Sequence, residues 1–140
     1  MSGEPPIPPP PDGFVAMPPR SEFAGHNGPV FHRPQAEGVE HALFILPRHT
    51  NGLGLLHGGM LSAFLDSLLG SAVHRGVGRT GVTVHLSVDF LRMARKGEWL
   101  RGEARMTHAT RDVAFAEGGA YIGRHLVGRA TGVFKLMGAP

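Results

Sequence analysis

Residues 60–74 carry the one clear helical period in the sequence, and they constrain the fold more than any other segment. Their apolar residues recur at intervals of three and four, which places them along one side of a helix. The residues that define this period are Leu61, Phe64, Leu65, Leu68 and Ala72. Few charged side chains occur around the rest of the helix. We therefore expect a helix that is buried on most sides, as it would be inside a sheet that wraps around it.

The segments after residue 80 have the two-residue period of β-strands. In residues 82–90, valine, leucine and phenylalanine alternate with polar residues and predict a half-buried strand. Further strands are expected at residues 39–46, 99–107, 113–122 and 125–137. Short breaks between consecutive strands favour antiparallel hairpins. The order of one strand, one helix and four strands predicts an α+β fold, with one long helix packed on a curved antiparallel sheet of about five strands.

The length and the distribution of proline suggest one domain with an irregular start. A chain of 140 residues, 41% of them hydrophobic, can fill one core but is too short for a second folded domain. Residues 1–34 contain all but two of the 12 prolines. We expect this segment to be partly extended, turning or disordered, although Phe14, Phe23 and Phe31 could dock on the core. The single domain is expected at residues 35–140.

Composition excludes several classes of function. The sequence has no cysteine, which excludes disulfides, thiol catalysis and zinc sites built from cysteine. A signal-peptide pattern and an apolar run of about 20 residues are both absent, so we expect a cytoplasmic protein outside the membrane. The Lys and Arg residues that give a pI of 10.2 are scattered, and an anionic small ligand explains them as well as nucleic acid does. The nine histidines lack metal-ligand spacing, so neither a metal nor a cofactor is expected.

The densest run of unusual residues is Asn-Gly-Leu-Gly-Leu-Leu-His-Gly-Gly, residues 51–59, directly before the helix. N–H groups at the start of a helix lack partners within it, and the helix dipole favours developing negative charge there. Gly58 and Gly59 have no side chain to block a substrate, so a carbonyl oxygen bound at this point would be polarised. Asp66, about two turns further along, could act as a base or a nucleophile. The combination suits acyl transfer.

These residues also have simpler structural explanations. The glycines could merely let the helix begin in a tight space, and Asp66 could be a polar residue at a solvent edge. An otherwise apolar helix has little solvent edge, however, and Ser62, Asp66 and Gly70 form one small and polar stripe along it. A phosphate-binding loop does not fit, because His57 stands where a third glycine is needed. We therefore favour a functional site.

The same residues resemble a known family. Asn51, the His57-Gly58-Gly59 element and Asp66, eight residues after the first paired glycine, resemble the signature of hotdog-fold acyl-CoA thioesterases of the PaaI type. The order of strand, helix and four strands is similar as well, and the resemblance extends from about residue 14 to residue 136. It implies hydrolysis of an acyl-CoA thioester without a cofactor. It also implies a homodimer or a dimer of dimers, that is, a homotetramer.

The resemblance assigns roles to individual residues. The N–H of Gly58 would polarise the thioester carbonyl, and Asp66 would activate water or attack directly. These two residues would serve one site from different subunits, because the family dimerises with its two helices side by side. Asn51 and His57 would shape the pocket and help to orient the thioester or the water. Thr83 would lie near that water.

Substrate binding is implied for a second set of residues. Arg92, Arg95, Lys96 and Arg111 fall in hairpin regions where this family commonly meets the phosphates of CoA, although each alone could be an ordinary surface residue. Gly59 would line the substrate site. Aryl, short-chain and medium-chain acyl groups all remain candidates. Two alternatives also remain, a hotdog hydratase or dehydratase acting on acyl thioesters and a non-catalytic module that binds acyl-CoA.

Overall fold

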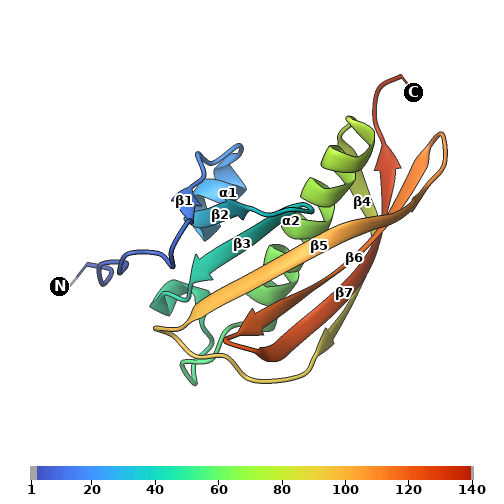
Figure 1. The fold of residues 1–140 in the computed structure, drawn as a ribbon. Coiled ribbons are helices and arrows are strands. Elements are labelled where there is room, and N and C mark those ends of the chain that lie inside the picture. Colours follow the sequence, from blue (N-terminus) through green and yellow to red (C-terminus); the bar gives the residue numbers. More distant parts are fainter. Residues whose placement is uncertain (1–2, 140) are drawn as a thin grey trace.

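The computed structural model describes residues 3–139 and contains one long helix and a single sheet (Figure 1). The elements in chain order are β1 (Val15–Ala16), α1 (Glu22–Asn27), β2 (Val30–Pro34), β3 (Val39–Phe44), the 3-10 helix η1 (Pro47–His49), α2 (Gly58–Val77), β4 (Gly81–Phe90), β5 (Trp99–Ala109), β6 (Val113–Ile122) and β7 (His125–Leu136). In this part of the chain, no helix has the length and hydropathy needed to span a bilayer.

The sheet is antiparallel and curves around α2 (Figure 1). Its strand order is β1-β2-β3-β5-β6-β7-β4, so β4 forms one edge although it follows the helix directly. The predicted α+β hotdog architecture is confirmed. The sheet has seven strands rather than about five, because β1 and β2 from the Pro-rich segment extend it beyond β3.

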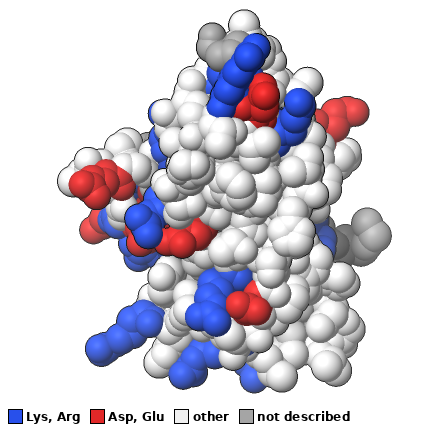
Figure 2. Space-filling model, turned by 90° about the vertical axis from the view of Figure 1, so that its right-hand side faces the viewer, with Lys and Arg blue, Asp and Glu red and all other residues white. Residues whose placement is uncertain are grey.

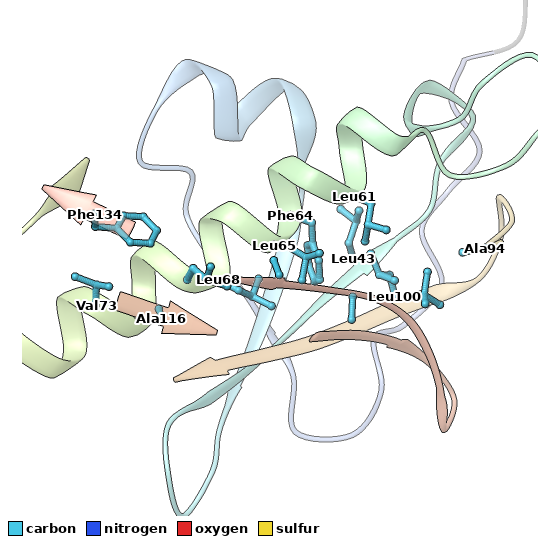
Figure 3. Packing of buried hydrophobic residues seen from close by; sticks show 14 of the residues in the cluster. Leu43, Leu61, Phe64, Leu65, Leu68, Val73, Ala94, Leu100, Ala116 and Phe134 are labelled. Atoms are coloured by element: carbon cyan, nitrogen blue, oxygen red, sulfur yellow. The ribbon is translucent and has the colours of Figure 1, made fainter. Parts of the chain in front are cut away.

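The core lies between α2 and the inner face of the sheet (Figure 3). The buried residues of α2 are Leu61, Phe64, Leu65, Leu68, Leu69, Ala72 and Val73. They pack against Leu43, Leu100 and Phe134 from three strands. Burial of each large side chain contributes about 1.5–3 kcal/mol, so this contact accounts for most of the hydrophobic stabilisation of the domain.

The Pro-rich segment docks on the outer face of the sheet. Phe14 and Phe31 are buried in a second, smaller cluster, whereas Phe23 is exposed. The guanidinium groups of Arg33 and Arg101 lie 4.8 and 5.1 Å from the centre of the Phe14 ring. Such cation–π contacts and the pairing of β2 with β3 explain why this segment adopts a defined path.

A β-bulge in β4 changes which side chains face the helix. The register with β7 shifts between Thr83 and His85, so that Val84 is an extra residue. Thr83 faces α2 before the bulge, and Leu86 packs on the core after it. Val84 is 63% exposed. The alternating pattern of residues 82–90 therefore does not define one continuous buried face, because the bulge reverses the alternation.

Close approach of α2 to the sheet requires glycine at residue 102. A Cβ added to Gly102 would lie 2.6 Å from Cδ2 of Leu68 and 2.9 Å from Cε2 of Phe64. We expect Gly102→Ala to lower the free energy of unfolding by about 1–3 kcal/mol, the usual cost of overpacking a core. Gly52→Ala is the matched control, since nothing lies within 4 Å of its added Cβ. Denaturant unfolding of both variants checks this, and equal losses of stability would contradict it.

A buried histidine makes stability depend on pH. His41 in β3 is only 6% exposed, and its Nδ1 has no hydrogen-bond partner among the described residues. Burial, reinforced by the positive charge of Arg75, lowers the pKa of His41 from 6.5 to about 4. Between these two pH values the unfolded chain binds the extra proton, so the free energy of unfolding falls as the pH decreases through this window.

The expected loss between pH 6.5 and pH 4 is about 3 kcal/mol from His41 alone, at 1.36 kcal/mol per pKa unit. His41→Leu removes the titrating group and should flatten this part of the profile, whatever its effect at neutral pH. Urea unfolding at a series of pH values measures the slope for each protein. An unchanged slope in the variant would show that His41 is not the group responsible.

Candidate active site

The long helix begins at the paired glycines, and His57 caps it. The backbone of His57 is extended, and its Nδ1 atom accepts a hydrogen bond of 2.8 Å from the N–H of Gly59. This bond satisfies one of the four N–H groups that a helix leaves unpaired at its start. Because Nδ1 is the acceptor, the neutral imidazole carries its proton on Nε2.

Asn51 shapes the loop that leads to the helix. Its Oδ1 accepts hydrogen bonds from the N–H groups of Leu53 (2.9 Å) and Leu55 (3.2 Å). Gly54 has a φ of +73°, a left-handed conformation that favours glycine. The loop is also tied to the β4–β5 connection, since the N–H of Leu56 donates to the carbonyl oxygen of Ala94. Asn51 therefore organises the approach to His57.

The N–H of Gly58 occupies the first helical position and has no hydrogen-bond acceptor within residues 3–139. A Cβ added to this residue would lie 3.3 Å from Cε1 of Phe90, at the end of β4. Glycine thus leaves room for a small group between the helix start and this ring. Phe90 is not among the site residues predicted from the sequence, because its place in an alternating strand suggested a core residue. Its exposure is apparent only once β4 is placed beside α2.

The Asp66 carboxylate faces β4. The hydroxyl of Thr83 donates a hydrogen bond of 2.6 Å to its Oδ1, and the pair is partly buried. Asp66 belongs to none of the ion pairs formed among the described residues. Its Oδ2 accepts no hydrogen bond from residues 3–139. The bulge at Val84 is responsible for this contact, because it lets Thr83 face the helix together with Leu86.

The candidate residues form two groups that lie apart in one chain. His57, Gly58 and Gly59 surround the start of α2, whereas Asp66 and Thr83 meet further along it. Eight residues of α-helix at about 1.5 Å each separate Gly58 from Asp66 by roughly 12 Å. A single carbonyl group cannot contact both residues of the same subunit.

The expected phosphate-binding residues are also divided. Arg92, Arg95 and Lys96 are exposed on the β4–β5 connection, near the start of α2. Arg111 lies in the β5–β6 turn, where its carbonyl oxygen accepts a hydrogen bond from Arg79 after the end of α2. The 11 residues of β5 place these ends about 35 Å apart. Figure 2 shows basic side chains at both ends of one face, with a broad uncharged area between them.

A hollow of about 940 Å³ does not border these residues. It is lined by the β2–β3 hairpin, the last turns of α2 and residues of β4 to β7, among them Gly38, Arg75 and Asp89. A smaller hollow of about 290 Å³ borders His57 and Gly59. No three of the described His, Asp or Glu side chains are grouped so that they could hold a metal ion.

A long helix wrapped by a curved antiparallel sheet is the arrangement of the hotdog fold. The sequence model of the thioesterase superfamily matches residues 53–128, more than half of the chain. The chain therefore belongs to the thioesterase superfamily.

Similar proteins agree with this assignment. A candidate esterase of Pseudomonas aeruginosa is 37% identical over 129 residues, which cover 90% of this chain and 96% of the relative. Among solved structures, a candidate thioesterase of Ralstonia eutropha described as phenylacetic acid degradation-related is 30% identical, with a TM-score of 0.74 over 84% of this chain and 92% of that one. A Bacillus halodurans protein solved with CoA is 28% identical, with a TM-score of 0.65 over 69% and 70% of the two chains.

Proposed function

We propose that the protein hydrolyses an acyl-CoA thioester to the free acid and CoA. The observation that carries this proposal is the Asp66 carboxylate, held by the Thr83 hydroxyl on an otherwise apolar helix, with its second oxygen unpaired within the described chain. In this mechanism Asp66 acts as a general base toward water or as a nucleophile toward the carbonyl carbon. As a base, Asp66 takes a proton from the attacking water, and the tetrahedral intermediate then breaks its C–S bond and expels the CoA thiolate. As a nucleophile, Asp66 forms an acyl anhydride with loss of the thiolate, and water then hydrolyses this anhydride to the free acid and restores the carboxylate.

The oxyanion is stabilised by the N–H of Gly58. This donor is unpaired within the described chain and lies at the positive end of the α2 dipole. Its direction is fixed by the cap at His57, so no reorganisation is needed during the reaction. Glycine at position 58 gives the carbonyl more room beside the Phe90 ring, because a Cβ there would lie 3.3 Å from Cε1 of Phe90.

Two subunits are needed to complete the site. Gly58 and Asp66 are about 12 Å apart along one helix. Gly58 must therefore act together with the partner's Asp66, and Asp66 with the partner's Gly58. A two-fold axis beside Ser62, midway between them, places Gly58 of one antiparallel helix opposite Asp66 of the other. The position of β4 supports such a dimer. This strand forms an edge of the sheet that can pair with a copy of itself, and it exposes the apolar side chains of Val82 and Val84.

CoA is the proposed carrier of the acyl group. The Bacillus halodurans relative was solved with CoA. In this chain the exposed Arg92, Arg95 and Lys96 lie on the connection that packs against the loop before α2, where they can meet phosphate groups. Arg111 lies at the opposite end of β5 and can reach the same ligand only from another subunit.

Asp66→Asn should reduce kcat by two orders of magnitude or more with little change in KM, because general-base assistance is worth about 10²–10⁴ in rate. Thr83→Ala should be milder, since it leaves the carboxylate in place. Asp112→Asn, in the exposed β5–β6 turn, is the matched control and should behave as wild type. The measurement is thiol release from a panel of acyl-CoA substrates.

A folded Asp66→Asn protein that keeps more than about a tenth of the wild-type kcat would contradict the proposed mechanism. Binding of acyl-CoA without thiol release by wild type would instead indicate a binding module. Hydration or dehydration of the acyl chain without thiol release would indicate a hydratase or dehydratase.

Mixing of two inactive variants tests the shared site. Asp66→Asn lacks the carboxylate, and Gly58→Val crowds the carbonyl position beside Phe90. Each heterodimer combines the intact Gly58 of one chain with the intact Asp66 of the other, so co-expression should restore roughly a quarter of wild-type activity if subunits pair at random. The two homodimers mixed without subunit exchange are the control. A co-expressed sample as inactive as this control would contradict a site that is shared between subunits.

A further inference from the structure

The chain contains two asparagines, and a glycine follows each of them, at Asn27-Gly28 and at Asn51-Gly52. Asparagine is a thermolabile residue, and it deamidates most readily before glycine, because glycine has no Cβ to shield its backbone nitrogen from the asparagine side chain. In a folded protein the reaction also requires that the two residues can move toward each other. The two sites differ in this respect.

Contacts hold Asn27 and Gly28 at the end of α1. Nδ2 of Asn27 donates a hydrogen bond of 2.9 Å to the carbonyl oxygen of Phe23, and the N–H of Gly28 donates one of 2.9 Å to that of Ala24. Nε2 of the buried His49 lies 3.0 Å from the carbonyl oxygen of Asn27. The Gly28 nitrogen therefore cannot attack the asparagine side chain unless these contacts break.

Gly52 lies in the exposed turn of the loop before α2, and its N–H donates no hydrogen bond within residues 3–139. Nothing lies within 4 Å of a Cβ added to Gly52, and the next residue, Leu53, is 79% exposed. Nδ2 of Asn51 also has no hydrogen-bond partner in the described part of the chain. The peptide between Asn51 and Gly52 can therefore move at low cost, and water can reach it.

The side chain of Asn51 is also activated for attack. Its Oδ1 accepts hydrogen bonds from the N–H groups of Leu53 (2.9 Å) and Leu55 (3.2 Å). These donors polarise the side-chain carbonyl and would stabilise the oxygen anion that forms when a nucleophile adds to Cγ. The ring closed by the hydrogen bond from Leu53 contains both Cγ of Asn51 and the nitrogen of Gly52, so the two reacting atoms belong to one turn.

We propose that Asn51 is a site of spontaneous deamidation and that the resulting isoaspartate inactivates the enzyme, the second part resting on the proposed function. The Gly52 nitrogen gives its proton to hydroxide or water and attacks Cγ of Asn51. The Cγ–Nδ2 bond then breaks, and Nδ2 takes up a proton and leaves as ammonia, which leaves a cyclic succinimide. Water opens this ring at Cγ to give aspartate, or at the backbone carbonyl carbon to give isoaspartate.

Isoaspartate changes the main chain of the loop. It routes the chain through Cβ and Cγ of residue 51 and turns the former backbone carbonyl into a free carboxylate. In the unmodified loop the N–H of Asn51 donates to the carbonyl oxygen of Leu55, and its carbonyl oxygen accepts from the N–H of Gly54. A longer main chain cannot keep this pair of bonds in register. The loop that leads to His57 and Gly58 would then lose its fixed path.

The test is to age the full-length protein in mildly alkaline buffer and to follow both asparagines by mass spectrometry. Trypsin releases Asn27 within residues 21–48 and Asn51 within residues 49–75. In the folded protein the second peptide should gain the mass difference between an amide and a carboxylic acid, and the first should not. In protein unfolded by guanidinium both peptides should gain it, because the contacts that hold Asn27 are then lost.

Gly52→Ala is the matched variant, because it keeps Asn51 while its Cβ shields the attacking nitrogen. The added Cβ meets nothing within 4 Å, and Gly52 is not among the glycines with a left-handed backbone, so the variant should fold. Its deamidation at Asn51 should be several-fold slower than in wild type. Methyl transfer by a protein isoaspartate methyltransferase measures the isoaspartate formed. Wild type should lose thiol release from acyl-CoA in step with this signal, and the variant should retain a larger fraction of its initial rate.

An unmodified Asn51 in the aged folded protein, or equal modification of Asn27 and Asn51, would overturn the proposed site. Equal rates in wild type and Gly52→Ala would overturn attack by the Gly52 nitrogen. Formation of isoaspartate without loss of thiol release would overturn the inactivation. A lack of thiol release from every acyl-CoA by fresh wild type would overturn the proposed function and the inactivation with it, while the peptide masses would still decide whether Asn51 deamidates.

Discussion

Burial of α2 against the concave face of the sheet is the interaction on which the remaining structure depends. Seven residues of the helix are buried, and the sheet approaches closely enough that a Cβ at Gly102 would overlap Leu68. Tight packing of this kind fixes the rotation of the helix about its axis. Because the rotation is fixed, the Asp66 side chain faces β4. The residue at which the helix begins fixes the direction of the Gly58 N–H.

The geometry of one helix also sets the relation between the two parts of the site. Because an α-helix has a fixed rise, Gly58 and Asp66 keep a constant separation in each subunit. In the proposed dimer this separation is matched by an identical one in the partner, so both sites form together. Assembly is then part of catalysis rather than an addition to a finished enzyme, and a protein diluted below its dimer dissociation constant would lose activity without unfolding.

Much of the fold could be predicted because its main signals are local. The helical period of residues 60–74 and the alternation in the later strands predicted the order of elements, and the rarity of a carboxylate on an apolar helix singled out Asp66 as a candidate site residue. The docking of β1 and β2 depends on contacts distant in sequence, including the Phe14 ring under Arg101. The separation of Arg111 from the other cations follows from strand length and order, which no short motif encodes.

The bulge in β4 has a consequence for how this protein can change over evolution. Thr83 faces the helix only because one additional residue, Val84, separates it from the register of Leu86. Substitution at Val84 changes an exposed side chain and preserves that arrangement. Deletion of the same residue would turn Thr83 away from Asp66 or displace Leu86 from the core. The length of this strand is therefore more tightly constrained than its composition, so that homologous chains should tolerate replacements here but not gaps.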